Sequence, residues 1–299
     1  MRRITRTLLL ALVASLMFPL QVGLAETPVT VATGLVDLRA NAPEGTFLPL
    51  GMPPILTQDS YQSQDIHITI SRLRDEESKS DVTIADVWVS SLAYLRRAYA
   101  LNRFDGEMRS MKTLATENRA ILAMTGDYAN LLNAGLSVGN GQVHRKSENS
   151  LRDNGLLLKD GRMLTFQRRQ MDVPGMLALG VWQAFLFGPA LLVDGQAIER
   201  FDSTIRRANP RSAIGYYEPG HYAFVVVDGR SSASRGMTLE QLSAFMQGLG
   251  MRAAYNLDGG QSAMLWFNGE VITNPVKGGR RLKDILVVGE LPVTGEAGD

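Results

Sequence analysis

Short apolar runs that end in or flank an Asn-Gly or Asp-Gly pair recur through the sequence, and they constrain the fold more than any other feature. Asparagine and aspartate next to glycine tolerate the positive φ angles of tight turns, so each pair predicts the end of a strand. The runs cover residues 138–143, 156–158, 190–193, 222–227, 253–257 and 263–267. The pattern therefore predicts a fold rich in short β-strands.

The region before these runs predicts further strands and two helices. Isoleucines alternate with polar residues over 65–70, which predicts a half-buried strand, and 82–89 is expected to return from it as a hairpin. Ser91 predicts the cap of a short helix that runs to residue 99. A second helix is expected over 108–118 and a buried strand over 120–124.

The last third of the chain carries the clearest helix signal. Thr238 and Gln241 have the spacing of a capping box. Apolar residues then recur at helical spacing: Leu239, Leu242, Phe245, Met246 and Leu249. A final strand is expected over 285–288, and no internal repeat is evident. Together these elements predict one α+β domain on a mixed, largely antiparallel β-sheet with flanking helices.

The N-terminus predicts a signal peptide over residues 1–25. Three arginines precede an apolar stretch over 8–20, and small residues stand at the −3 and −1 positions of a cleavage site after Ala25. The alternative is a retained membrane anchor, but the apolar stretch is shorter than the roughly 20 residues that span a bilayer. We expect cleavage, no transmembrane anchor in the mature protein, and a periplasmic or extracellular location.

The remaining sequence is expected to have three parts. Proline recurs over 26–60 without sustained periodicity, which predicts an irregular lead-in with one or two short strands. The domain itself is expected over 61–290, and a flexible tail over 291–299.

Composition excludes several function classes. Without the first 25 residues the chain has 28 basic and 30 acidic side chains, a formal charge of −2, which disfavours a general nucleic-acid binder. The absence of cysteine excludes disulfides, thiolate zinc sites and a cysteine nucleophile. No HExxH motif or phosphate-binding P-loop occurs, and none of the three histidines, His67, His144 and His221, lies in a nucleophile elbow.

Three aspartates at strand ends beside glycines are the candidate reactive groups: Asp127, Asp228 and Asp258. Taken singly, an aspartate before glycine is more often a turn residue. Asn256 and Asp258 differ because strand alternation places both on one face, while Leu257 points into the core. Gly259 and Gly260 would then let a ligand or another backbone approach closely.

Several arginines could present a guanidinium group to a phosphate or a carboxylate. They are Arg211, Arg230, Arg235, Arg280 and Arg281. Surface charge is the alternative role for each. Arg211 follows a proline turn and precedes an apolar strand, which favours a place in a pocket.

Four ordered motifs resemble the phosphodiester glycosidase family, which includes the catalytic domain of N-acetylglucosamine-1-phosphodiester α-N-acetylglucosaminidases. They lie at residues 211–215, 227–230, 234–240 and 255–262, and the segments 126–128 and 188–195 also match. The resemblance covers residues 60–289. Thr125 and Ala129 depart from the Asn-Gly-Asp-Tyr-Tyr motif of bacterial relatives, and Gln261 replaces a third glycine.

The resemblance implies hydrolysis of a sugar-1-phosphodiester to a free sugar and a phosphomonoester. Phosphate is a good leaving group, so one carboxylate acting as base or nucleophile and arginines that stabilise charge would suffice. Asp258 or Asp127 is expected in the first role, with Asp228 the third candidate. Asn256 is expected to bind sugar hydroxyls and Arg211 the phosphate. Further substrate-binding candidates are Gly259, Gly260, Ser262, Arg230 and Glu240, the last ranked lower because the first turn of a helix explains an acidic residue.

Two alternative functions remain open at this level. The pocket could bind an exopolysaccharide or cell-wall glycan without cleaving it, or a metal-dependent phosphodiesterase could break the P–O bond instead. The expected partner is a carbohydrate phosphodiester or a cell-envelope glycan. The sequence requires no cofactor, and it leaves open a divalent cation, the sugar, the stereochemical outcome and the oligomeric state.

Overall fold

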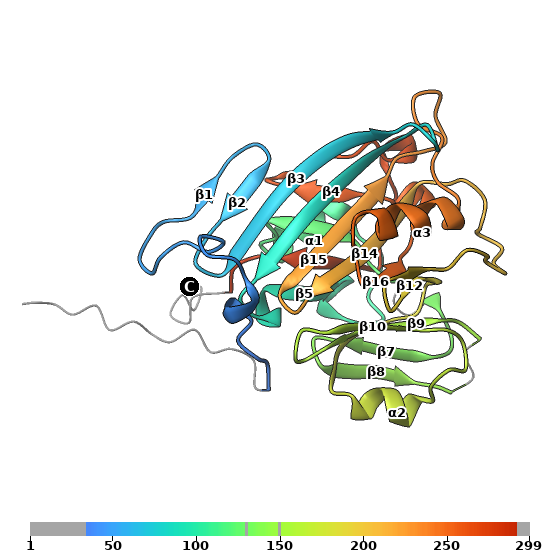
Figure 1. The fold of residues 1–299 in the computed structure, drawn as a ribbon, viewed down its shortest axis with the longest axis horizontal. Coiled ribbons are helices and arrows are strands. Elements are labelled where there is room, and N and C mark those ends of the chain that lie inside the picture. Colours follow the sequence, from blue (N-terminus) through green and yellow to red (C-terminus); the bar gives the residue numbers. More distant parts are fainter. Residues whose placement is uncertain (1–33, 129–130, 149–150, 292–299) are drawn as a thin grey trace, which may run out of the picture. The chain divides into compact units, whose positions relative to one another are not determined.

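The computed structural model describes residues 34–128, 131–148 and 151–291. These residues form three antiparallel sheets (Figure 1). The largest has nine strands in the order β1 (Ile55–Leu56), β2 (Ser60–Gln62), β3 (Ile66–Asp75), β4 (Ser80–Val89), β15 (His221–Val227), β14 (Arg211–Glu218), β16 (Ala253–Asn256), β12 (Ala190–Val193) and β13 (Gln196–Ala197). The α+β class and the antiparallel pairing are confirmed.

Two five-stranded sheets and three α-helices complete the described fold. One sheet has the order β10 (Met163–Phe166), β9 (Asn154–Leu158), β11 (Val181–Phe185), β7 (Leu136–Gly139) and β8 (Gln142–Lys146). The other has the order β18 (Glu270–Val271), β17 (Leu265–Phe267), β6 (Leu122–Thr125), β19 (Asp284–Val288) and β5 (Leu95–Tyr99). The helices are α1 (Met111–Glu117), α2 (Val173–Ala178) and α3 (Leu239–Gly248).

The nine-stranded sheet has a core on each face. Alternate residues of β3 and β4 enter the larger core, which also holds side chains of the other two sheets. The opposite face packs against α3, whose predicted capping box is present because Thr238 and Gln241 bond to each other's backbone. The predicted hairpin of β3 and β4 is likewise confirmed, with ten paired positions.

The helix predicted from Ser91 to residue 99 is wrong. Ser91 does accept a hydrogen bond from Ala93 N–H, but it caps only a single turn, Leu92–Tyr94. The chain then forms β5, which pairs along its whole length with β19. Arg97 of β5 also forms a buried ion pair with Asp284 of β19. Both contacts join segments that are far apart in the sequence, so the residues around Ser91 could not reveal them.

Several predictions concern residues outside the described part. The signal peptide, its cleavage site and the tail beyond residue 291 lie there, and they remain predictions. Within the described lead-in, a turn of 3₁₀ helix at Arg39–Asn41 precedes β1, and Leu38 is buried in the larger core. Among the described residues, no helix is both long and apolar enough to cross a membrane.

The ends of β6, β16 and β19 position the candidate site. Asp258, which follows β16, donates its backbone N–H to the Gly126 carbonyl, which follows β6, at 3.2 Å. Gly126 in turn donates to the carbonyl of Asp284 at the start of β19, at 3.1 Å. These two bonds connect the nine-stranded sheet to a five-stranded one, so carboxylates from both sheets meet at one place.

Candidate functional site

Asp258 forms an ion pair with Arg280 at the end of β16. Arg280 Nη2 lies 2.7 Å from Asp258 Oδ2, and Arg280 Nε donates to the Ser262 hydroxyl. The Asp258 side chain is 8% exposed, whereas that of Arg280 is 37% exposed. Burial raises the pKa of Asp258, while Ser262 and Arg280 oppose this effect. The pair thus joins a desolvated carboxylate to a cation that reaches solvent.

The glycines after Asp258 bring a second arginine to the same turn. Gly260 has a φ of 62° and donates its N–H to the Pro210 carbonyl at 2.9 Å. A side chain at Gly259 would begin 2.8 Å from that carbonyl, and one at Gly260 would begin 3.2 Å from Arg230 Nη2. The predicted close approach is therefore made by the backbone of Pro210 and by the Arg230 guanidinium.

Asp127 lies in a fully enclosed cluster with Arg97 and Asp284. Its carboxylate accepts from Leu186 N–H at 2.8 Å and from Phe187 N–H at 2.7 Å. Arg97 Nη2 lies 3.6 Å away, and Arg97 Nε donates to Asp284 Oδ2 at 2.7 Å. Burial raises the pKa of Asp127 to about 7 against the opposing effects of Arg97 and of these backbone N–H groups. In this geometry Asp127 holds the chain after β11.

Sequence reasoning missed both partners of Asp127. Arg97 and Asp284 are buried, and Arg97 Nη2 and Asp284 Oδ1 have no hydrogen-bond partner among the described residues. One sequence feature could have identified them: Arg97 lies within an apolar run, and Asp284 immediately precedes one. Arg97 was assigned to a helix, and Asp284 precedes the expected strand over 285–288, so neither stood out.

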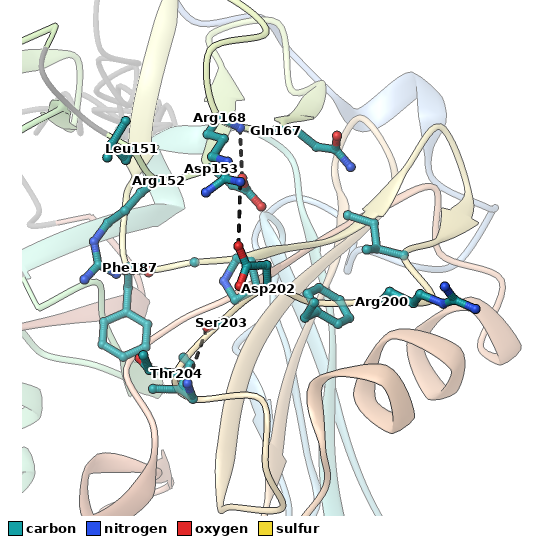
Figure 2. A pocket seen from close by; sticks show the side chains of 15 residues that line it. Leu151, Arg152, Asp153, Gln167, Arg168, Phe187, Arg200, Asp202, Ser203 and Thr204 are labelled. Carbon is teal, nitrogen blue, oxygen red and sulfur yellow. Dashed lines mark hydrogen bonds and ion pairs between the residues drawn. The ribbon is translucent and has the colours of Figure 1, made fainter.

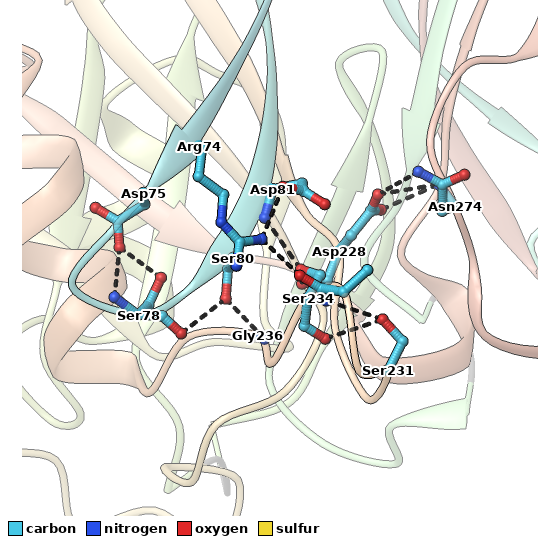
Figure 3. A network of polar contacts seen from close by, with 11 residues as sticks. Arg74, Asp75, Ser78, Ser80, Asp81, Asp228, Ser231, Ser234, Gly236 and Asn274 are labelled. Atoms are coloured by element: carbon cyan, nitrogen blue, oxygen red, sulfur yellow. Dashed lines mark hydrogen bonds and ion pairs between the residues drawn. The ribbon is translucent and has the colours of Figure 1, made fainter.

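Asp228 belongs to a separate network of polar contacts (Figure 3). Its carboxylate accepts from the backbone N–H of Asn274 at 3.1 Å and from the Asn274 side-chain amide at 2.8 Å. Its backbone carbonyl accepts from the Ser234 hydroxyl at 2.6 Å, and Ser234 Oγ accepts from Asp81 N–H at 3.0 Å. Burial raises the pKa of Asp228. The network ties the turn after β15 to the β3–β4 hairpin and to Asn274.

The other predicted groups have partners of their own. Arg211 is buried and donates to the carbonyls of Met237, Ile205 and Arg207 at 2.9, 2.7 and 2.6 Å. Burial lowers its pKa to about 10. Asn256 donates to the Gly188 carbonyl at 2.7 Å, and its Oδ1 has no partner among the described residues. Glu240 lies in the first turn of α3. Their substrate-binding roles stay predictions.

A cleft of about 520 Å³ lies beside the segment that Asp127 holds (Figure 2). Three arginines line it: Arg152, Arg168 and Arg200. Arg152 and Phe187 lie on one side of the view and Arg200 on the other. The volume is within the usual range for a small-molecule site.

Aromatic contacts connect this cleft to Asp258. The Phe187 ring contacts the Tyr128 ring edge to face, with 6.1 Å between centroids. Arg280 Cζ lies 5.3 Å from the centroid of Tyr128. A crevice of only about 10 Å³ lies between Asp258 and Asp284, too small for a sugar. Arg280, the partner of Asp258, is the member of this group that reaches solvent.

The described residues contain no cluster of three or more histidine, cysteine, aspartate or glutamate side chains that could hold a metal ion. The site is built instead from paired charges and backbone donors. Its exposed cations suit an anionic ligand.

Comparisons with known proteins show the family and the fold. The family model described as phosphodiester glycosidase matches residues 117–289. The SPbeta prophage-derived uncharacterized protein YomE of Bacillus subtilis is 31% identical over 118 residues, 38% of this chain and 18% of that protein. The chain thus spans under a fifth of that relative's length.

Two solved structures share the fold. The zebrafish N-acetylglucosamine-1-phosphodiester α-N-acetylglucosaminidase catalytic domain, auto-inhibited by its pro-peptide, is 21% identical with a TM-score of 0.58, covering 76% of this chain and 83% of its own. A hypothetical protein from Synechocystis is 15% identical with a TM-score of 0.56, covering 80% of this chain and 64% of its own.

Proposed function

Because the chain belongs to the phosphodiester glycosidase family, we propose that it hydrolyses the glycosidic bond of a sugar-1-phosphodiester. The products are a free sugar and a phosphomonoester. In this reaction the oxygen of water forms a bond to the anomeric carbon. Water attacks either directly or after a carboxylate has first bonded to that carbon, in which case water then displaces the carboxylate. The bond from that carbon to the phosphate oxygen breaks, and its electron pair stays on the phosphate.

The Asp258–Arg280 pair is the observation that carries the proposal. A partly desolvated carboxylate can attack the anomeric carbon or take a proton from water, because desolvation raises its basicity. The adjacent guanidinium can stabilise the negative charge that develops on the leaving phosphate. Tyr128, over the guanidinium, limits the directions from which a substrate can enter.

Arg230 is the second group that we assign to the phosphate. Its guanidinium lies against Gly260, on the same turn that carries Asp258. Arg230 is exposed and donates to Asn209 Oδ1 at 2.7 Å, a neutral partner, so its charge is not cancelled there. The arginine-lined cleft beside Phe187 would hold the group on the other side of the phosphate.

Asp127 takes a positioning role in this account. Both of its oxygens accept backbone hydrogen bonds, so neither is free to attack a substrate without unlocking Leu186 and Phe187. Asn256 is buried, and its Oδ1 has no hydrogen-bond partner among the described residues, so a role at a sugar hydroxyl would require the surrounding chain to open. Asp228 and Arg211 support loops at the same edge of the sheet.

Hydrolysis of a glycosyl phosphodiester in ¹⁸O-labelled water tests the proposal. We expect the label in the sugar, because the anomeric carbon is attacked. Label in the phosphate would indicate P–O cleavage, and an absence of products with retained binding would indicate a glycan-binding protein. Asp258→Asn should abolish release, whereas Asp194→Asn, at an exposed turn between β12 and β13, should leave it unchanged.

The proposal includes export from the cytoplasm. It rests on the signal peptide predicted over residues 1–25, and the expected substrate is a glycan of the cell envelope. N-terminal sequencing of protein recovered after expression in a bacterial host should begin at Glu26. A sequence that begins at Met1 would contradict it.

A further inference from the structure

A second cavity, of about 280 Å³, lies at the outer edge of β5. β5 is the last strand of its sheet, and the β7–β8 hairpin faces its free edge. There Asn140 accepts from Arg97 N–H and donates to the Arg97 carbonyl, both at 2.8 Å. The cavity shares no lining residue with the cleft at Phe187 or with the crevice at Asp258.

Three rings form the apolar wall of this cavity. Phe104 and His144 are stacked, with 4.8 Å between centroids and planes 2° apart. The Tyr99 ring meets His144 edge to face at 4.9 Å and Phe104 at 5.7 Å. Aromatic faces carry partial negative charge and attract polarised C–H groups, so such a wall suits the C–H face of a sugar ring.

The Tyr99 hydroxyl is buried in this wall without a partner. Tyr99 is 8% exposed, and its hydroxyl has no hydrogen-bond partner among the described residues. A side chain at Gly139 would begin 2.2 Å from this hydroxyl, so glycine there provides the space that the group occupies. Burial raises the pKa of Tyr99 to about 12, so the hydroxyl stays neutral and able to donate. A buried donor of this kind weakens the fold unless a ligand satisfies it.

The polar side chains that could bind a ligand in this cavity are uncharged carboxamides. Besides Asn140, the carboxamides of Asn102, Asn118 and Gln142 line the cavity, and that of Asn118 donates to the Leu114 carbonyl at 2.8 Å. The two lining arginines are committed, because Arg97 pairs with Asp284 and Arg96 donates to the carbonyls of Ala93 and Gly289. None of the described lining residues is a carboxylate. Amides that both donate and accept suit the hydroxyls of a neutral polyol better than an anion.

The rim of the cavity is strained. Leu101 and Asn102 have φ angles of 58° and 54°, a left-handed conformation that asparagine tolerates but that strains Leu101. Leu101 is also 42% exposed, so burial does not offset that cost. A strained backbone conformation persists only where the surrounding structure fixes it, and such residues are frequent at binding sites.

We propose that this cavity binds one neutral sugar residue, with the Phe104–His144–Tyr99 wall against its ring and the Tyr99 hydroxyl and the carboxamides on its hydroxyls. It is a second saccharide site, separate from the Asp258 site. Binding at this cavity involves its own lining residues and does not depend on the proposed hydrolysis.

The test is a titration of the ¹⁵N-labelled full chain with methyl glycosides of glucose, galactose, mannose and N-acetylglucosamine, followed by chemical shifts. We expect one of them to shift residues around β5 and the β7–β8 hairpin. Tyr99→Phe should weaken that binding about tenfold, the effect of one lost hydrogen bond, without lowering the melting temperature. Tyr217→Phe, on β14, is the matched control and should bind as the native chain does.

The outcomes separate this site from the proposed hydrolysis. Binding that persists in Asp258→Asn and weakens in Tyr99→Phe supports the cavity whether or not the protein cleaves phosphodiesters. Unchanged binding in Tyr99→Phe, shifts confined to the Asp258 site, or binding only of inorganic phosphate or of a planar aromatic such as adenine would overturn the proposal. A Phe104→Ala variant that binds the sugar normally would also contradict it.

Discussion

The turns after β15 and β16 begin alike in sequence and differ in structure. Asp228-Gly229 directly follows β15, Asp258-Gly259 begins two residues after β16, and the two strands flank β14. The Asp228 carboxylate accepts from the neutral backbone and side-chain donors of Asn274. Asp258 instead pairs with the partly exposed Arg280. The first arrangement closes a loop, and the second leaves a charge pair that a ligand can reach.

The partner of each aspartate therefore decides its role. A carboxylate that accepts from a backbone N–H and an amide is satisfied and rigid, as at Asp228. An exposed guanidinium next to a carboxylate, as at Arg280, can also bind a substrate anion. The following predictions test this contrast.

Replacement of Asp258 by asparagine should have the largest effect on activity. We expect kcat to fall at least about 10³-fold, because the general base or nucleophile is removed. The free energy of unfolding should change by under about 1 kcal/mol, since asparagine keeps the shape and a hydrogen bond. Steady-state kinetics and urea unfolding measure the two quantities. Activity near that of the native chain in a folded variant would remove Asp258 from the reaction.

Replacement of Arg280 by glutamine should lower kcat about 10²-fold, the usual cost of losing one charge-stabilising donor. Arg74→Gln is the matched control, because Arg74 also pairs with an aspartate, Asp81, at 2.8 Å but belongs to the Asp228 network. We expect the control to keep its kcat. An equal loss in both variants would erase the distinction between the two regions.

Replacement of Asp228 by asparagine should affect stability and leave chemistry intact. The new amide would face the Asn274 N–H groups, and the lost acceptor should cost about 2 kcal/mol in the free energy of unfolding. The kcat of the folded fraction should stay within about threefold of the native value. Urea unfolding followed by assay in native buffer gives both numbers. A large loss of kcat at unchanged stability would place Asp228 in the reaction.

The pH dependence should show the smallest effect. Because burial raises the pKa of Asp258, kcat/KM should fall with acid at a higher pH than for an exposed aspartate. Arg280 lowers that pKa, so its removal in Arg280→Gln should shift the acid limb to still higher pH. A pH–rate profile of the native chain and the variant checks the direction. A shift to lower pH would contradict the assignment.

Sequence patterns predicted a helix or strand correctly where the residues that define it are neighbours in the sequence. The capping box at Thr238 and the alternation on β3 depend on neighbouring residues, and both appear in the structure. β5 was predicted as a helix because its pairing with β19 is invisible locally. The same limit explains why one expected sheet proved to be three.

The candidate site was predictable in part. The sequence singled out Asp258, Gly259, Gly260 and Arg230, which the structure brings to one turn. Local spacing ranked Asp258 above Asp228, but it could not reveal their partners, Arg280 and Asn274, which are distant in sequence. It also could not show that Arg211 donates to backbone carbonyls, or that Arg97 and Asp284 enclose Asp127.

Binding of a glycosylmethyl phosphonate monoester, an anion in which CH₂ replaces the glycosidic oxygen, tests the role of the Asp258–Arg280 pair. The analogue cannot be cleaved, so calorimetry reports affinity alone. We predict that Asp258→Asn binds it at least as tightly as the native chain and that Arg280→Gln binds it at least about tenfold more weakly. Equal affinity for the native chain and for Arg280→Gln would contradict the account.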